Sequence, residues 1–161
     1  MNDLFEYVPS AVIGTVSGLR TFTSPAAVSR AAANSSLPVQ EPLLGFLRSP
    51  KTATALTILA ALELIGDKLP STPSRLKPPA LIARLISGAF CGAALASAKK
   101  KDIRQGAIIG GIAALGGAIA GYQVRRMIVE DTDVPDFVVA LAEDAIAVSL
   151  AIASPNLPAS R

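Results

Sequence analysis

The chain has 161 residues, enough for one domain, and a formal net charge of only +3. Hydrophobic residues make up 51% of it and charged residues 17%, whereas a typical soluble domain has about 25% charged residues. This balance disfavours a soluble protein, and the small net charge gives no basis for a nucleic-acid partner. The sequence contains no His, which excludes His-based catalysis and the usual zinc sites. Its single cysteine, Cys91, excludes an intrachain disulfide.

Five apolar segments predict an all-α, polytopic membrane helical bundle that forms a single domain over residues 1–161. They cover approximately residues 8–30, 52–67, 80–98, 105–124 and 134–154. A full crossing needs about 20 residues, so the uncharged segment 105–124 is the clearest span and 52–67 is short. Arg20 and Pro25 interrupt the first segment. Four spans plus one re-entrant or interfacial helix are an alternative arrangement. A soluble, Ala-rich helical bundle is the other alternative.

The links between these segments predict which end of each helix faces the cytoplasm. Residues 31–51 form a proline-punctuated loop, residues 68–79 a rigid proline-rich turn that is itself a candidate re-entrant segment, and residues 99–104 a basic turn. With five spans, one side of the membrane receives eight Lys and Arg residues and the other receives six. The positive-inside rule then places the N-terminus outside and the C-terminus in the cytoplasm, in a cell (inner) membrane.

Glycines recur at four-residue spacing within the apolar segments. Such small-xxx-small faces let helix backbones approach closely in lipid. We therefore expect these glycines to mediate helix packing, within one subunit or between the subunits of a homo-oligomer or a membrane complex, rather than to line a pore. The pairs are Gly14 with Gly18, Gly88 with Gly92, Gly106 with Gly110, and Gly117 with Gly121.

A weak internal similarity links the first two segments to the last two. GTVSGLR at residues 14–20 resembles GAIAGYQ at residues 117–123, and ALELIGD at residues 61–67 loosely resembles VALAEDA at residues 139–145. One intervening span would invert the second copy, as in the inverted repeats of small transporters. Shared packing chemistry or chance is the alternative explanation.

Ionisable residues inside apolar segments are costly and therefore mark candidate sites. Glu63 and Asp67 lie four residues apart and share a helix face. Two carboxylates without His suit proton relay or a hard cation such as Mg²⁺ or Ca²⁺. The alternative is that Asp67 is a span-end charge and that Glu63 only pairs with an arginine.

Arg20 is the expected counter-charge, either for Glu63 or for the adjacent acids Glu143 and Asp144 of the last segment. Because neighbouring residues on a helix point about 100° apart, at least one of Glu143 and Asp144 should face the bundle interior. A snorkelling arginine is the alternative for Arg20. A further basic group around the proline-rich turn either binds lipid phosphates, pairs with the nearby acids, or anchors the spans as a solvated flank. It comprises Lys68, Arg75, Lys77 and Arg84.

Several stretches resemble a family of bacterial membrane proteins catalogued as domain of unknown function 4126. They are GLRTF, ELIGDKLPSTPSRLKPPALIARLISGAFCGAAL, GGAIAGYQVRR and ALAEDAIAV, and GDKLPSTPSR is the most specific of them. The resemblance covers nearly the whole chain and implies an integral membrane protein. It implies no particular activity.

The leading functional hypothesis is a small transporter or channel for an ion or solute. Its internal site would combine Arg20, Glu63, Asp67 and Glu143 or Asp144. A non-transporting structural or accessory subunit of a membrane complex is the second hypothesis. A Mg²⁺-dependent enzyme acting on lipid phosphates ranks third, because no nucleophile motif accompanies the acids. No cofactor is expected, and the transported species and the oligomeric state stay open.

Overall fold

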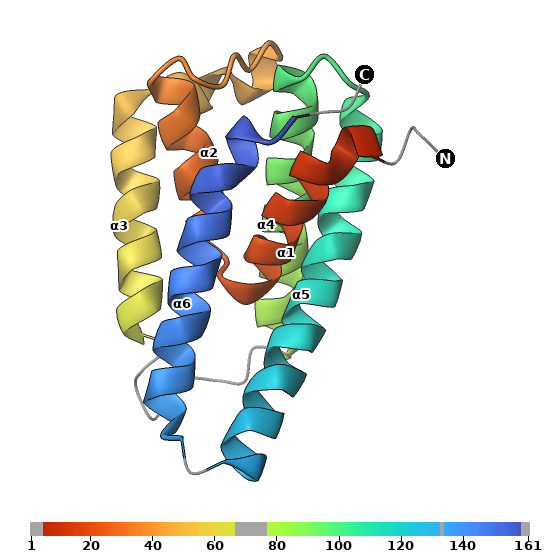
Figure 1. Ribbon diagram of the computed structural model, residues 1–161. Coiled ribbons are helices and arrows are strands. Elements are labelled where there is room, and N and C mark those ends of the chain that lie inside the picture. The colour runs from red at the N-terminus through yellow and green to blue at the C-terminus, as the bar shows by residue number, and fades with distance from the viewer. Residues whose placement is uncertain (1–4, 67–76, 133, 159–161) are drawn as a thin grey trace.

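The computed structural model describes residues 5–66, 77–132 and 134–158, and every regular element within these ranges is a helix. Six α-helices form the bundle shown in Figure 1. Short 3-10 helices precede α1 (η1, Phe5–Tyr7), follow α2 (η2, Pro42–Arg48) and follow α6 (η3, Ser154–Asn156). The all-α class predicted from the sequence is confirmed.

The first apolar segment, over residues 8–30, is two helices that double back, and the chain breaks at Arg20, one of the two predicted interruptions. Helix α1 covers Val8–Leu19 and α2 covers Thr23–Ala33. Arg20 ends α1 in an extended conformation, at φ −140° and ψ 115°. In Figure 1, α1 descends to the middle of the bundle and α2 returns from there to the end where α1 began. The two helices therefore form a hairpin that turns back in the middle of the bundle.

Proline and serine shape this hairpin. Pro25 lies in the first turn of α2, where a missing N–H breaks no helical hydrogen bond. The break itself falls earlier, at residues 20–22, so Pro25 starts the second helix rather than ending the first. Ser24 donates a hydrogen bond from its hydroxyl to the carbonyl of Ile13 at 3.0 Å, which ties α2 to α1.

Four longer helices surround the hairpin: α3 (Pro50–Gly66), α4 (Pro78–Ala98), α5 (Ile103–Asp131) and α6 (Asp136–Ala153). By length and hydropathy, three helices of the described chain can cross a membrane: α4, α5, and α6 continued to Asn156. Helix α3 has 17 residues and is apolar for most of its length. The predicted five crossing helices are therefore not shown, because the first segment is a broken pair and the 17 residues of α3 fall short of the about 20 that a full crossing needs.

Glycines allow the closest backbone contacts, which lie where α1, α4 and α5 meet. A Cβ added at Gly14 would lie 2.8 Å from the Cα of Gly110, and one added at Gly88 would lie 2.6 Å from the carbonyl oxygen of Gly110. An added Cβ at Gly92 would lie 3.0 Å from the same Cα. Gly110 thus sits between α1 and α4, and a larger residue there would push helices apart.

The two glycine segments of the suggested inverted repeat pack against each other. A Cβ at Gly18 would lie 2.9 Å from the carbonyl carbon of Gly117, and one at Gly117 would lie 3.0 Å from the Cα of Thr15. Their forms differ, because residues 14–20 end a short helix and residues 117–123 lie inside the continuous α5. An inverted repeat would need matching forms, so shared packing chemistry explains the similarity better.

Gly121, the predicted packing partner of Gly117 in the sequence, is half-buried.

Residues near both ends of the chain lie beside the turn between α4 and α5. Lys101 forms an ion pair with Glu6 at 2.9 Å, and the Asp102 N–H donates to the Tyr7 hydroxyl at 3.2 Å. Lys99 donates to the carbonyl of Leu157 at 2.9 Å. The described residues next to both termini therefore lie at the same end of the bundle (Figure 1), whereas the sequence analysis places the termini on opposite sides of a membrane.

We predict that the effect of a glycine-to-alanine substitution in α5 on stability depends on whether the new methyl group meets another helix. Gly110→Ala should lower the free energy of unfolding by about 1–3 kcal/mol, because the added methyl group meets backbone atoms of Gly88 and Gly92 in α4. Gly116→Ala should leave stability unchanged or raise it, since no atom lies within 4 Å of its Cβ position and alanine favours helix. Thermal unfolding of both variants in detergent measures this. Equal stability of the two variants would contradict the packing account.

Candidate functional site

The break between α1 and α2 leaves backbone polar groups without helical hydrogen-bond partners in the middle of an apolar bundle. Helix ends leave N–H and C=O groups without partners inside the helix. In a membrane such groups need partners from the protein, because the lipid offers none. We define the hairpin turn as residues 20–22, and its partners come from α3, α4 and α6.

Glu63 of α3 caps the start of α2. Its two carboxylate oxygens accept hydrogen bonds from the N–H groups of Thr21 at 2.6 Å and Phe22 at 2.8 Å. The N-cap residue of α2, Phe22, makes no side-chain cap hydrogen bond of its own. Because a helix N-terminus carries partial positive charge, the carboxylate supplies both hydrogen bonds and a favourable charge.

Arg84 and Ser87 of α4 cap the end of α1 in the complementary way. The Arg84 guanidinium donates from Nη1 to the carbonyls of Gly18 at 2.7 Å and Leu19 at 2.6 Å. The Ser87 hydroxyl donates to the carbonyl of Thr21 at 2.6 Å. Arg84 is only 4% exposed. A cation at a helix C-terminus matches the partial negative charge of the last carbonyls.

The turn itself carries a charge that reaches the last helix. Arg20 is fully buried, and its guanidinium forms an ion pair with the Asp144 carboxylate of α6. Asp144 is 8% exposed. Removing one partner of such a pair strands the other charge in a medium that solvates it poorly. The pair therefore fastens the hairpin turn to α6.

Together these contacts form one site, which we call the turn cluster: Arg20, Glu63, Arg84, Ser87 and Asp144. It contains two guanidinium groups and two carboxylates, each on a different helix or on the turn. Two helix ends of opposite partial charge meet there. Chemically, such a cluster can hold a small ion or transfer a proton, and it can equally serve to fix the hairpin.

The family of the chain follows from a match to a family model over residues 10–160, which includes every member of the turn cluster. The chain belongs to the family described as "Domain of unknown function (DUF4126)". No curated protein and no solved structure matches the chain.

The structure resolves one open choice about Arg20: its ion pair is with Asp144, and Glu63 instead bonds to the backbone of the adjacent residues. Glu143, next to Asp144, is half-buried, so the two acids differ in environment as their spacing implied. Of the basic group, Arg84 lies inside the bundle and Lys77 is exposed. Asp67, Lys68 and Arg75 lie outside the described residues.

Ser87 is the cluster member that sequence reasoning missed. One serine among many in an apolar helix is an uninformative signal. Its position three residues after Arg84 was the available indication, because residues at i and i+3 share a helix face. Among the described residues, no group of three or more Cys, Asp and Glu side chains is arranged to hold a metal ion.

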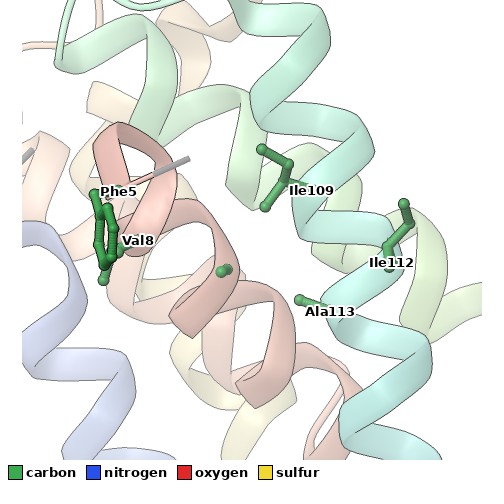
Figure 2. A pocket seen from close by; sticks show the side chains of 6 residues that line it. Phe5, Val8, Ile109, Ile112 and Ala113 are labelled. Carbon is green, nitrogen blue, oxygen red and sulfur yellow. The ribbon is translucent and has the colours of Figure 1, made fainter. Parts of the chain in front are cut away.

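An apolar groove lies apart from the turn cluster, between the start of α1 and α5, with a volume of about 450 Å³ (Figure 2). Figure 2 shows only carbon on the side chains that line it. They are Phe5, Val8, Ala11, Ile109, Ile112 and Ala113. With no polar side chain, the groove adds no chemistry to the site.

We predict strong energetic coupling between Arg20 and Asp144. Arg20→Ala and Asp144→Ala should each lower the free energy of unfolding by about 3–5 kcal/mol, since each removes one partner of a buried ion pair. The double variant should cost clearly less than the sum. Denaturant unfolding in detergent gives the four values. The same cycle on the exposed pair Arg126 and Glu130 is the control and should show much smaller coupling. Additive effects at Arg20 and Asp144 would contradict the pairing.

We also predict that Glu63→Gln destabilises the protein by about 1.5–3 kcal/mol, because an amide offers one acceptor oxygen where the carboxylate offers two. The matched control is Glu130→Gln, at an exposed position of α5. Unfolding curves of both variants in one detergent provide the comparison. A Glu63→Gln protein as stable as the control would show that the cap is dispensable.

Proposed function

We propose that the protein is a small multi-pass membrane transporter or channel for an ion or proton, and that the turn cluster is its internal site. The observation that carries this proposal is a helix broken at mid-bundle with charged side chains on the break. Discontinuous helices of this kind form the ion and substrate sites of many transporters. Ionisable residues at that depth are retained in membranes chiefly for function.

The proposed mechanism uses competition for Asp144. A cation or proton that reaches this carboxylate weakens its attraction to Arg20. Because Arg20 belongs to the hairpin turn, the occupancy of Asp144 is then coupled to the position of the turn. Glu63 and Arg84 keep the two helix ends capped while this happens. In this mechanism the Asp144 carboxylate is the part that responds to the ion, and Glu63 and Arg84 keep the hairpin turn in place.

In the membrane we propose four crossing helices, α3 to α6, around the re-entrant hairpin. Helix α5 has 29 residues, which at about 1.5 Å per residue exceeds the roughly 30 Å of the hydrocarbon core. The glycine faces then serve as packing surfaces in lipid. Association into homo-oligomers or with another membrane protein belongs to the same proposal.

Basic residues support a cytoplasmic location for both termini. Seven described Lys and Arg residues lie towards the end of the bundle that carries the termini, and three lie at the opposite end (Figure 1). The positive-inside rule favours the richer side as cytoplasmic. The seven are Arg30, Arg48, Lys51, Lys99, Lys100, Lys101 and Arg104, and the three are Lys77, Arg125 and Arg126.

A second candidate function is a structural subunit of a membrane complex. It is favoured by the hydrogen bonds within the turn cluster, because Glu63 and Arg84 already bond to backbone groups of the hairpin. On this account the charges exist to allow the fold, and the exposed apolar faces of α5 and α6 meet partner helices. The flux measurement below separates the two candidates.

We predict ion or proton flux in proteoliposomes that contain the purified protein. Arg20→Lys should reduce the flux while keeping the charge, since lysine lacks the planar fork that pairs with a carboxylate. The exposed variant Arg126→Lys is the control and should retain full flux. Correct folding of each variant is checked by its melting temperature. A folded wild-type protein without flux of protons, alkali cations or small anions would favour the structural subunit.

We further predict that reporter tags at the N-terminus and the C-terminus are both cytoplasmic. The hairpin contributes no net crossing and four helices return the chain to its starting side. Protease protection in right-side-out and inverted vesicles reads each tag separately. Tags on opposite sides would contradict the re-entrant arrangement.

A further inference from the structure

A second groove runs along α2, between α3 and α6, and ends near the turn cluster. Its volume is about 260 Å³. Helix α2 contributes Thr23, Ala26, Ala27 and Arg30, and α3 contributes Thr57, Ala60, Ala61 and Leu64. Both sets follow the spacing i, i+3, i+4, i+7, so each is one stripe of a helix. Val148, Ala151 and Ile152 of α6 form the third wall.

Alanines create the space, and polar groups mark its two ends. At the outer end, Arg30 is exposed and donates to the Thr57 hydroxyl at 3.0 Å. Among the described residues no carboxylate forms an ion pair with Arg30, although it belongs to the basic end of the bundle. An unneutralised guanidinium beside an apolar groove is suited to an anionic head group.

The inner end contains a buried hydroxyl that needs a partner. Thr23 is 6% exposed, and its hydroxyl has no hydrogen-bond partner in the described part of the chain. Leaving such a group unsatisfied costs free energy, about 1–3 kcal/mol in proteins. Thr23 lines the groove, so a bound molecule can supply the missing partner.

The dimensions define the ligand. Arg30 lies seven positions after Thr23 in α2, which corresponds to about 10 Å along the helix. Helix α2 runs from mid-bundle towards the basic end, so the charged end of the groove lies outward and the apolar part lies deeper (Figure 1). A lipid-like molecule in a bilayer has the same orientation, with its head group outward.

We propose that this groove binds a single-chain anionic amphiphile, a carboxylate whose chain carries a second hydrogen-bonding group about 10 Å from its head. The carboxylate pairs with Arg30, the chain lies on the alanines of α2 and α3, and the second polar group meets the Thr23 hydroxyl. The exposed side chains of Ala61 and Ile152 form the rim, so the ligand enters sideways from the bilayer. This binding does not depend on the transport function proposed above.

The experiment uses the absence of Trp from the chain. Ile152→Trp, at the exposed rim, introduces one fluorophore beside the groove. In nanodiscs of zwitterionic lipid, decanoate brominated along its chain should quench this indole saturably. A brominated cationic amphiphile of equal chain length should quench it only in proportion to its partitioning.

Three further variants in the Ile152→Trp background test each part of the site. Arg30→Gln should weaken saturable quenching about ten-fold, whereas Lys51→Gln, an exposed charge at the same end, should leave it unchanged. As a competitor, 10-hydroxydecanoate should displace the brominated probe about 3–10-fold better than decanoate does. Thr23→Val should abolish that preference.

Quenching that is unsaturable and equal in Arg30→Gln and Lys51→Gln would overturn the proposal. Equal competition by the two acids on the protein that retains Thr23 would overturn the part assigned to Thr23. The melting temperature of each variant is measured first, and Arg30→Gln is expected to fold because its side chain is exposed. Loss of flux in these variants is not a criterion, so failure here and failure of the transport proposal are distinguishable.

Discussion

The rest of this structure depends on one constraint: a chain that turns back inside an apolar bundle must find partners for its freed backbone groups. The hairpin between α1 and α2 finds them on other helices. Glu63 accepts from two N–H groups, and Arg84 and Ser87 donate to three carbonyls. These bonds place α3 and α4 on opposite sides of the turn. The Arg20 and Asp144 pair then brings α6 to the same point.

Close packing is the second half of this arrangement. The short α1 can enter the bundle only if the neighbouring backbones approach it, and Gly14 and Gly18 allow that approach against α5. Gly88 and Gly92 allow α4 to meet α5 in the same way. The polar contacts at the turn and the glycine contacts along α1 therefore act on the same hairpin. Loss of either is expected to disturb the other.

Sequence reasoning succeeded where one physical cause dominates. Apolar segments of sufficient length predicted the helices, and the cost of burying charge identified Arg20, Glu63 and Asp144 as residues that need partners. It failed where two causes compete. Residues 8–30 are apolar enough for one span. The break at Arg20 is stable only because side chains of α3 and α4 form hydrogen bonds with the backbone of the turn. The prediction of termini on opposite sides of the membrane depends on counting that segment as one crossing.

The partner of each charged side chain could not be predicted, because the order of the segments along the chain does not tell which helices lie next to each other in the bundle. Arg20 had acids available on two segments, and only packing selects Asp144 over Glu63. Arg84 was grouped with loop residues by its nearness to the proline-rich turn, although it lies inside the bundle. Arg84 lies seven positions after Lys77, so it is two turns into α4, and nearness in sequence to the proline-rich turn does not place it beside that turn in space.

A turn that is capped inside the bundle shields the Thr21 and Phe22 amides from exchange with solvent. Residue-specific hydrogen exchange at these two positions measures this shielding. We expect slow exchange in the wild-type protein, comparable to that of amides within α4, and much faster exchange at these two positions in Glu63→Gln. Rapid exchange of both amides in the wild-type protein, equal to that of an exposed loop, would contradict the capped turn.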